Sequence, residues 1–524
     1  MGSLRAKLPR TIPWLLLAGM VLAYPATPAF GAGLAQDTAA GTDSAVRPAQ
    51  DSAPAESISP QPGGVRLGQM RTDVATPLSA RLRSMLGMAA LLLIGWVLST
   101  NRRLIQWRVI IGGTVLQLAF GLFILKTALG VAIFAGVNDV VISLLGYTIE
   151  GAQFLFGNLV FNNVPVGSGA AGNAPMVPDG QTVAATGAFF AFNVLPTIIF
   201  FSSLMTLLYY FGVMQAVVRG VAWVMMRTMK TSGAETLSAA GNIFLGQTEA
   251  PLLIKPFIAK MTLSELMTVM TGGFATVAGG VMAAYVGMLV FYFPDIAGHL
   301  LAASVMSAPA ALVFAKLMVP ETEEPVTRGT LEVNVEKIDV NAIDAAARGA
   351  GEGLHLALNV GAMLLAFIAL VALLNAVLGW TGDVTRITSL LHGAGWLGEG
   401  QRLNLESLLG WLLAPLAWLM GVPWQDATTV GSLLGIKTVL NEFVSYLQLS
   451  TLLAGGSDLS PRSVVIATYA LCGFANFSSI AIQLGGIGGI APSRRSDLAR
   501  LGLRAMVAGT LAAFMTATIA GILV

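Results

Sequence analysis

Long apolar stretches of close to 20 residues recur along most of this chain of 524 residues. An α-helix of about that length crosses the roughly 30 Å hydrocarbon core of a bilayer. Only 11% of the residues are charged, whereas a soluble globular protein has about 25%. The sequence therefore predicts an all-α polytopic membrane protein. Its formal net charge of +2 gives no indication of nucleic-acid binding.

The first 80 residues differ in composition from the rest. Residues 1–31 combine a basic start, the apolar run WLLLAGMVLAY and a small-x-small site at 29–31, which is typical of a secretory signal peptide. An uncleaved anchor helix is the alternative. Residues 32–80 are rich in Ala, Ser, Pro, Asp and Gly without periodicity, which predicts a disordered periplasmic tail. Together they indicate a bacterial inner-membrane protein whose N-terminus lies outside the cytoplasm.

Basic residues between the apolar stretches predict the orientation of the chain. Arg102 and Arg103 follow the first stretch, and the loop PSRRSDLARLGLR precedes the last, so both are expected on the cytoplasmic side. The C-terminus is then outside. The eight expected spans are about 84–100, 109–126, 190–212, 263–289, 296–319, 354–378, 462–485 and 502–523.

The segments between the spans are assigned from composition. Residues 127–157, and those between 378 and 426, are mixed and are expected to lie in the membrane interface. Residues 158–186 are polar, Gly-rich and free of Lys and Arg, which predicts an external loop. Residues 321–353 are charged and are expected in the cytoplasm.

Two further apolar stretches lie at 233–259 and 427–450. The basic loops fall on the predicted sides only if each of these stretches enters and leaves the membrane on the same side. The first would enter from the cytoplasm and the second from outside, as in an inverted repeat. Each precedes a span interrupted by small and polar residues, GFATVAGG at 273–280 and GFANFSS at 473–479. Unwound backbone at membrane depth is tolerated only where it lines a cavity within the protein. The sequence therefore predicts two opposed re-entrant hairpins, two broken helices and a transport site between them.

Two carboxylates, Glu249 and Glu442, lie within the predicted hairpins. A carboxylate at mid-membrane costs at least about 2.5 kcal/mol, so each is expected to accept hydrogen bonds from a polar solute. Helix capping, or pairing with a buried cation, is the alternative. Gln247 and Thr248 add amide and hydroxyl groups that suit the edge of a heterocycle. Asn476, Ser478 and Ser479 add polar groups in the other half, although ordinary helix–helix hydrogen bonding would also explain any one of them.

The segments GNIFLGQTEAPLL, NEFVSY and ATYALCGFANFSSIAIQLGGIGGIAPSRR resemble the signature segments of concentrative nucleoside transporters. LPTIIF and SAPAALVFAKLMVPE also resemble that family, and the similarity extends over about 84–524. The resemblance implies a homotrimer that imports nucleosides together with a cation. It also implies a scaffold at 84–212 and 354–426, and a moving transport domain whose two repeats lie at 213–320 and 427–524.

The resemblance also implies the residues of the binding site. The nucleobase would face Gly246, Gln247, Thr248, Glu249 and Val281. The ribose would lie against Glu442, Asn476 and Ser479, with Phe474 nearby. The coupling ion would be Na⁺, held by Asn242, Leu245, Thr276 and Val277. Asn and Thr side chains and freed backbone carbonyls offer the oxygen ligands that a hard cation prefers. A proton is the alternative coupling ion.

A channel for small polar solutes and an intramembrane enzyme are the rival functions. A channel needs a continuous polar lining, whereas the polar residues here fall in two patches. For an enzyme the sequence offers no HExxH or GxSxG motif, and its three histidines are far apart. Cys472 has no His close to it in sequence, and the GSGAAG segment at 167–172 lies in the predicted external loop. We therefore expect neither catalysis nor a cofactor other than the coupling ion.

Overall fold

The computed structural model describes residues 76–161, 163–168, 177–185, 190–329, 339–398 and 400–524. The predicted signal peptide at 1–31 and nearly all of the predicted tail at 32–80 lie outside these residues. The chain separates into two units, Met1–Ser59 and Pro60–Val524, and every described residue belongs to the second unit.

Eight helical segments among the described residues are long and apolar enough to cross a membrane. The number of spans matches the prediction, but the segments that form them differ. The expected span at 462–485 is divided into two short helices, whereas the segment Ala128–Val160, expected at the interface, meets the criterion by length and composition. The other seven are Leu78–Val97, Trp107–Lys126, Phe190–Tyr210, Leu263–Leu289, Ile296–Met318, Ala342–Val384 and Pro492–Leu523.

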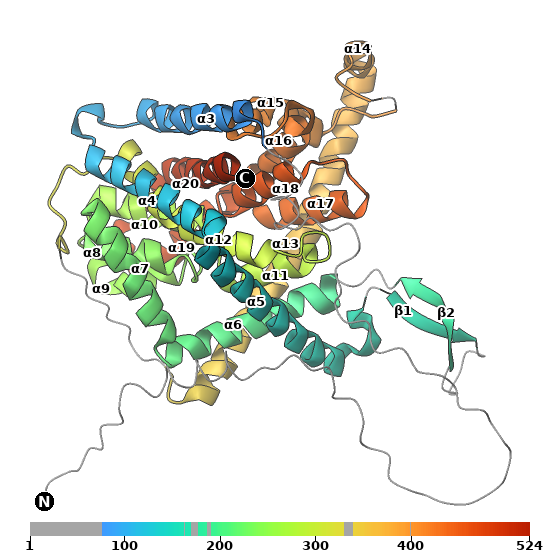
Figure 1. Cartoon of the computed structure of the whole chain (residues 1–524), viewed down its shortest axis with the longest axis horizontal. Coiled ribbons are helices and arrows are strands. Elements are labelled where there is room, and N and C mark those ends of the chain that lie inside the picture. The colour runs from blue at the N-terminus through green and yellow to red at the C-terminus, as the bar shows by residue number, and fades with distance from the viewer. Residues whose placement is uncertain (1–75, 162, 169–176, 186–189, 330–338, 399) are drawn as a thin grey trace, which may run out of the picture. The chain divides into compact units, whose positions relative to one another are not determined.

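The helices fall into a first group, two repeats and an intervening group (Figure 1). The first group is α3 (Leu78–Val97), α4 (Trp107–Lys126), α5 (Ala128–Phe156) and α6 (Leu195–Tyr210). The predicted first repeat, 213–320, holds α7 (Val213–Met229), α8 (Gly233–Gly241), α9 (Lys255–Ile258), α10 (Leu263–Ala275), α11 (Gly279–Leu289) and α12 (Ile296–Met318). The intervening group is α13 (Ala342–Val384), α14 (Ile387–Gly393) and α15 (Leu405–Met420). The second repeat is α16 (Trp424–Val439), α17 (Glu442–Ala454), α18 (Pro461–Leu471), α19 (Phe477–Ile490) and α20 (Arg495–Leu523). Short 3-10 or π turns are η1 (Arg102–Leu104), η2 (Gly157–Val160), η3 (Phe190–Val194), η4 (Ala250–Ile254) and η5 (Pro492–Arg494).

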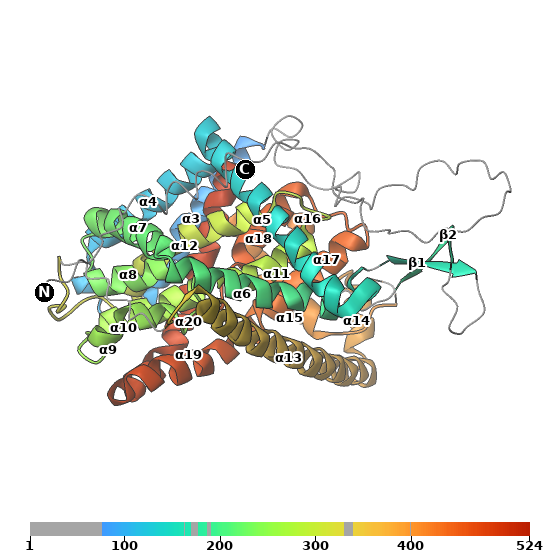
Figure 2. The same ribbon diagram turned by 90° about the horizontal axis from the view of Figure 1, so that it is seen from below.

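Both predicted hairpins form two helical arms joined by a turn. In the first, α8 packs against η4 and the turn lies at 242–249. Because α8 has 9 residues it spans only about 14 Å, less than half of a bilayer core. In the second, α16 packs against α17, and α15 meets α16 at 116°. Figures 1 and 2 both place α8 and α9 far from α16 and α17, as expected of hairpins that enter from opposed sides.

The core lies around α12 and α20, whereas α13 is at the surface. In the most apolar part of α20 78% of the residues are buried, and it packs against α3, α10, α12 and α18. The apolar part of α13 is only 6% buried. It contacts α6 through small residues four apart, and a Cβ added at Gly353 would lie 2.7 Å from the Ile199 Cα. This spacing brings the two helix backbones close together.

Two segments differ from their expected secondary structure. The expected external loop at 158–186 contains the antiparallel strands β1 (Asn163–Ser168) and β2 (Val177–Ala185), which pair Asn163 with Ala185. The expected span at 354–378 is the middle of a much longer helix, because α13 has 43 residues. It begins within the charged segment at 321–353, where the Asn341 side chain caps it by accepting a hydrogen bond from Asp344 N.

Candidate functional site

The interruptions of the two broken helices touch each other. α10 and α11 are separated by Thr276–Ala278, and α18 and α19 by residues 472–476. The Phe474 backbone N–H donates to the Thr276 carbonyl oxygen at 3.3 Å. Gly473 has a φ of +144°, and a Cβ there would lie 2.8 Å from the Phe274 oxygen. Only glycine allows this approach, so the crossing depends on that residue.

The tip of the first hairpin lies beside both breaks. Its Phe244 carbonyl accepts a hydrogen bond from Gly279 N at 3.0 Å, at the first turn of α11. Thr248 lies against α19 of the other repeat, where a Cβ on Gly486 would come within 2.5 Å of the Thr248 Cγ2. The hairpin tip therefore contacts elements of both repeats, as the inverted-repeat prediction requires.

A buried polar network joins the predicted nucleobase and ribose residues. Gln247 Nε2 donates to Ser479 Oγ at 3.1 Å. The Ser479 backbone N–H donates to Asn476 Oδ1 at 2.9 Å, which makes Asn476 the N-cap of α19. Asn476 Nδ2 in turn donates to Glu442 Oε2 at 3.0 Å. Four of the predicted site residues, from both repeats, are thus brought together in one chain of hydrogen bonds.

Glu442 is 4% exposed, and polar groups surround its carboxylate. Besides the Asn476 amide, the Tyr285 hydroxyl donates to Glu442 Oε1 at 2.9 Å. The Lys437 ammonium is also buried, but its hydrogen bond goes to the Ala470 carbonyl oxygen at 2.8 Å. Glu442 forms no ion pair among the described residues, so its two oxygens keep acceptor capacity for hydroxyl groups of a solute.

The remaining predicted nucleobase and ribose residues lie around this network, and the Phe474 carbonyl accepts a hydrogen bond from the Asn476 backbone N–H at 2.9 Å. Glu249 is exposed at the hairpin tip, and its carboxylate folds back over Gly246 and accepts from Thr248 Oγ1 at 3.3 Å. Val281 is buried on α11, and Phe474 is half-buried in the second break. The hairpin tip thus holds the half-buried Thr248 and the exposed Glu249 next to the buried Gln247.

The predicted cation ligands occupy two segments that touch. Asn242 caps the C-terminus of α8 and Leu245 follows in the turn, whereas Thr276 and Val277 form the first break. The Asn242 Nδ2 donates to the Ser238 carbonyl at 3.1 Å, and its buried Oδ1 has no hydrogen-bond partner among the residues that the structure describes. An unsatisfied buried oxygen is costly. The oxygen-only donor set suits Na⁺, and the described residues hold no group of three His, Cys, Asp or Glu that could bind a transition metal.

Two residues of the network were not predicted from the sequence. They are Tyr285 and Gln483, whose Nε2 donates to Gln247 Oε1 at 3.1 Å. Gln483 is buried on α19, four residues after Ser479 and so on the same helix face. Tyr285 is buried on α11, four residues after Val281. The helical spacing from a predicted site residue was a signal that would have identified both.

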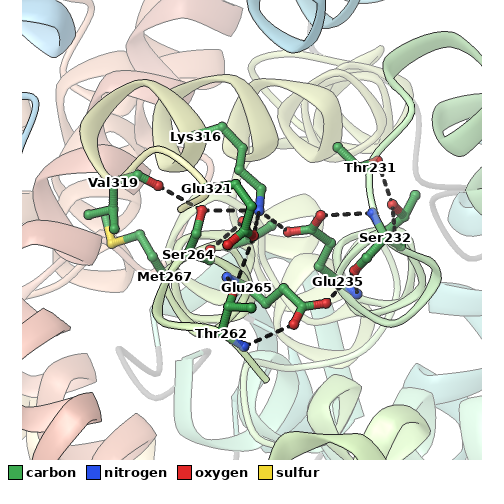
Figure 3. Close-up of polar contacts among 12 residues, drawn as sticks. Thr231, Ser232, Glu235, Thr262, Ser264, Glu265, Met267, Lys316, Val319 and Glu321 are labelled. Carbon is green, nitrogen blue, oxygen red and sulfur yellow. Dashed lines mark hydrogen bonds and ion pairs between the residues drawn. The ribbon is translucent and has the colours of Figure 1, made fainter. Parts of the chain in front are cut away.

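A second buried polar cluster lies at the base of the first hairpin (Figure 3). Lys316, on α12 and 2% exposed, has three ammonium donors, and all three have partners. They reach Glu235 Oε2 at 2.8 Å, Glu321 Oε2 at 3.0 Å and Ser264 Oγ at 3.1 Å. A buried cation is here matched by two carboxylates and a hydroxyl. The cluster thereby connects α8, α10 and α12.

Two capping boxes complete this cluster. Ser232 caps α8 with Glu235 at its third position, and Thr262 caps α10 with Glu265. The boxes are linked because Ser232 Oγ donates to Glu265 Oε1 at 2.5 Å (Figure 3). The spacing S/T-x-x-E is visible in the sequence at both positions, so it is a signal that our sequence analysis did not use.

The base of the second hairpin is joined to its broken helix in a similar way. Asp426, in the first turn of α16, accepts from Ser460, the N-cap of α18. The Ser460 Oγ lies 2.7 Å and its backbone N 3.1 Å from Asp426 Oδ2. In each repeat a carboxylate and a hydroxyl therefore attach the hairpin to the start of the broken helix, as pseudo-symmetry predicts.

Three family descriptions match most of the described chain. Residues 86–159 match the Na⁺ dependent nucleoside transporter N-terminus, 191–292 match a nucleoside recognition (Gate) domain, and 299–521 match the Na⁺ dependent nucleoside transporter C-terminus. An uncharacterized transporter from Haemophilus influenzae is 44% identical over 446 residues, which cover 84% of this chain and 98% of the relative.

A named relative and a solved structure agree with this match. The nucleoside permease NupC of Helicobacter pylori is 43% identical over 445 residues, which cover 84% of this chain and 98% of the permease. The structure of CNTnw in an inward-facing substrate-bound state is 42% identical, with a TM-score of 0.72, and the similarity covers 84% of this chain and 98% of that one.

The fold and the matches define a polytopic helical membrane protein of the transporter class. The chain belongs to the concentrative, Na⁺ dependent nucleoside transporter family. The family resemblance stated from the motifs is therefore confirmed, as is the fold class.

Proposed function

We propose that this protein is a symporter that imports nucleosides across the bacterial plasma membrane together with a cation, most simply Na⁺. The observation that carries the proposal is the buried hydrogen-bond chain from Gln247 through Ser479 and Asn476 to Glu442. It links residues of both repeats at the place where the hairpin tip meets the two breaks. Family membership supports nucleosides as the solute.

The two ends of this chain suit the two parts of a nucleoside. Gln247, with Thr248 and Glu249 beside it at the open tip, offers amide, hydroxyl and carboxylate groups for the polar edge of a nucleobase. Glu442 and Asn476 offer a carboxylate and an amide for the ribose hydroxyls. Val281 and Phe474 supply the apolar contacts that flank the base in this arrangement.

The proposed cation site lies directly behind the hairpin tip. Asn242 Oδ1 is a buried acceptor oxygen with no hydrogen-bond partner among the described residues, and it lies in the segment that the Gly279–Phe244 hydrogen bond holds against the first break. Filling this site would hold the tip in the conformation that presents Gln247. We infer that the tip is ordered first, that the nucleoside then bridges the two repeats, and that the transport domain moves afterwards.

The proposed coupling supplies enough free energy for accumulation. One positive charge moving inward down about 100 mV contributes about 2.3 kcal/mol. A tenfold ion gradient adds about 1.4 kcal/mol. Together they would sustain roughly several hundredfold accumulation of a neutral solute. A homotrimer and termini outside the cytoplasm complete the proposal.

The test uses purified protein in proteoliposomes and labelled uridine and adenosine. Na⁺ and pH gradients are imposed separately, and counterflow is measured. We expect saturable uptake that a Na⁺ gradient alone drives, and a loss of roughly tenfold or more in kcat/KM in Glu442→Gln and Glu249→Gln. The matched control is Glu323→Gln, because Glu323 is exposed and far along the chain from the site.

The outcomes separate the alternatives. Uptake driven only by the pH gradient would replace Na⁺ by H⁺ as the coupling ion. Uptake that does not saturate and shows no counterflow would indicate a channel. Near-normal uptake in both carboxylate variants would contradict the proposed site.

A further inference from the structure

Gln483 lies behind the proposed nucleobase residues, where it touches both the first broken helix and the hairpin tip. Its side chain is fully buried. Its Nε2 donates to the Met270 carbonyl oxygen on α10 at 3.1 Å and to Gln247 Oε1 at 3.1 Å. One amide nitrogen thus joins the backbone of α10 to the side chain that we assign to the nucleobase.

The chemistry of these partners determines which way each amide points. An amide has an NH₂ group and an oxygen of nearly equal shape, so only its hydrogen-bond partners distinguish the two orientations. The Met270 carbonyl can only accept, so the Gln483 atom that faces it must be the nitrogen. The same nitrogen faces Gln247, so the Gln247 atom in that contact must be the oxygen. Gln247 Nε2 is then left to face Ser479.

At the other end of the hydrogen-bond chain, the partners also determine the orientation of the Asn476 amide. The Ser479 backbone N–H can only donate, so the Asn476 atom that caps it must be Oδ1. Asn476 Nδ2 then faces Glu442, as observed. A backbone group therefore fixes the orientation of both proposed binding amides. The Ser479 N–H orients the Asn476 amide directly, whereas the Met270 carbonyl orients the Gln247 amide only through Gln483.

Close packing around Gly273 leaves the side chains of Gln483 and Gln247 little room to move. A Cβ added at Gly273 of α10 would lie 2.8 Å from Gln483 Nε2 and 2.8 Å from the Gln247 Cβ. Gly273 thus makes the room in which the two amides meet. Gln483 Oε1 is buried without a hydrogen-bond partner among the described residues, so the side chain's only polar contacts are the two that fix Gln247.

We propose that Gln483 is a positioning residue that sets whether Gln247 presents its N–H or its carbonyl to the nucleobase, and thereby the discrimination between cytidine and uridine. This inference rests on the proposed function. Cytosine carries an exocyclic N4 amino donor, and uracil, like thymine, carries an O4 acceptor at the same position. Turning over the Gln247 amide exchanges a donor for an acceptor at one place, which is the difference between these two bases.

The test compares cytidine with uridine in Gln483→Glu. A glutamate keeps the shape of Gln483 but has no nitrogen donor, so Gln247 is expected to turn and offer its own Nε2 to the carboxylate. We expect the ratio of kcat/KM for cytidine to that for uridine to change by roughly tenfold, the discrimination of one good hydrogen-bond pair. Gln483→Met keeps the volume but has no hydrogen-bonding amide, so nothing would fix the orientation of the Gln247 amide. This variant should also shift the ratio. Gln401→Glu, at an exposed position, is the control and should leave it unchanged.

A second pair of variants shows whether Gln483 acts through Gln247. In a Gln247→Ala background, Gln483→Glu should no longer change the ratio, because the amide that it orients is absent. An unchanged ratio in both Gln483 variants, with uptake of the two nucleosides reduced equally, would overturn the inference. A ratio that still shifts in the Gln247→Ala background would also overturn it. If the wild-type protein takes up neither nucleoside, the proposed function itself fails, and this result is distinct from the other two.

Discussion

At the scale of single residues, the site depends on positions where any side chain larger than hydrogen would collide with backbone. Gly473 is the clearest case, because it has a positive φ and lies where the two helix breaks cross. A Cβ there would also lie 3.0 Å from both the carbonyl carbon and the oxygen of Ala275. Neither neighbour is the flexible end of a side chain, so the collision can be relieved only by moving backbone.

Gly473→Ala is expected to destabilise the protein by about 1–3 kcal/mol, the usual cost of a strained backbone position. Gly485→Ala is the control, because Gly485 lies in the interior of α19 and a Cβ there meets no atom within 4 Å. That exchange should be neutral or stabilising by up to about 1 kcal/mol. Thermal unfolding in detergent measures both, and equal midpoints would contradict the crossing described above.

Most of the site residues could be predicted from the sequence, but not their connections. The motifs of the two hairpins and of the second broken helix identified Gln247, Glu442 and Asn476 as a set, and the structure brings these three into one network with Ser479. Gln483 escaped notice because a single Gln in an apolar helix has no motif of its own. Its spacing of four residues from Ser479 places it on the same helix face, but its role follows from its contacts with residues more than 200 positions away.

At the scale of elements, each hairpin is attached to the helix that follows it. In the first repeat the attachment depends on Lys316, because this residue is the only cation paired with the buried Glu235 within the described part of the chain. Breaking a buried ion pair by removing one partner is usually far more costly than replacing the whole pair, since the remaining charge is left buried.

Lys316→Met should therefore destabilise the protein by about 3–5 kcal/mol, because Glu235 and Glu321 lose their counter-charge. Lys260→Met, at an exposed position between α9 and α10, is the matched control and should change stability by less than about 0.5 kcal/mol. Thermal midpoints and denaturant unfolding report the difference. Similar stabilities for the two variants would show that the ionic cluster does not hold the hairpin.

The sequence predicted the hairpins and the broken helices better than it predicted the lengths of the elements. Interruptions by Gly, Ser and Asn are local and visible, so the breaks near 276 and 474 were found. The start of α13 was not found, because residues 342–352 carry the charges of a solvated segment and still form helix behind the Asn341 cap. Composition also did not decide whether α5, which the sequence placed at the interface, crosses the membrane.

At the scale of the whole molecule, the exposed apolar surface of α13 needs a cover other than water. The helix contributes large exposed side chains such as Leu365, Leu373 and Trp380. Lipid covers such a surface on a membrane protein, and so does a neighbouring subunit. We propose that in a homotrimer lipid and a neighbouring subunit both cover α13, because only 6% of its most apolar part is buried within this chain.

Ion binding should stabilise the whole protein if the Asn242 site is real. A ligand that binds only the folded state at 100 times its Kd adds about 2.7 kcal/mol of stability. We therefore expect the thermal midpoint to rise with NaCl and not with choline chloride at the same ionic strength. Asn242→Leu should abolish this rise. A Na⁺-dependent shift of equal size in the variant would place the ion elsewhere.

The contact between the two helix breaks restricts which parts can slide. Since Gly473 packs against the backbone of Phe274 and Ala275, we expect that the two repeats do not slide past each other, because sliding would separate the residues of the proposed site. We propose that the two repeats move together as one unit. The sliding surface would then lie outside the proposed site, where α11 packs against α6 and a Cβ on Gly280 would lie 3.0 Å from the Ser202 Oγ. Gly279 and Gly280 present no side chain to α6 there, so we expect this seam to offer little resistance when the proposed site is carried from one face of the membrane to the other.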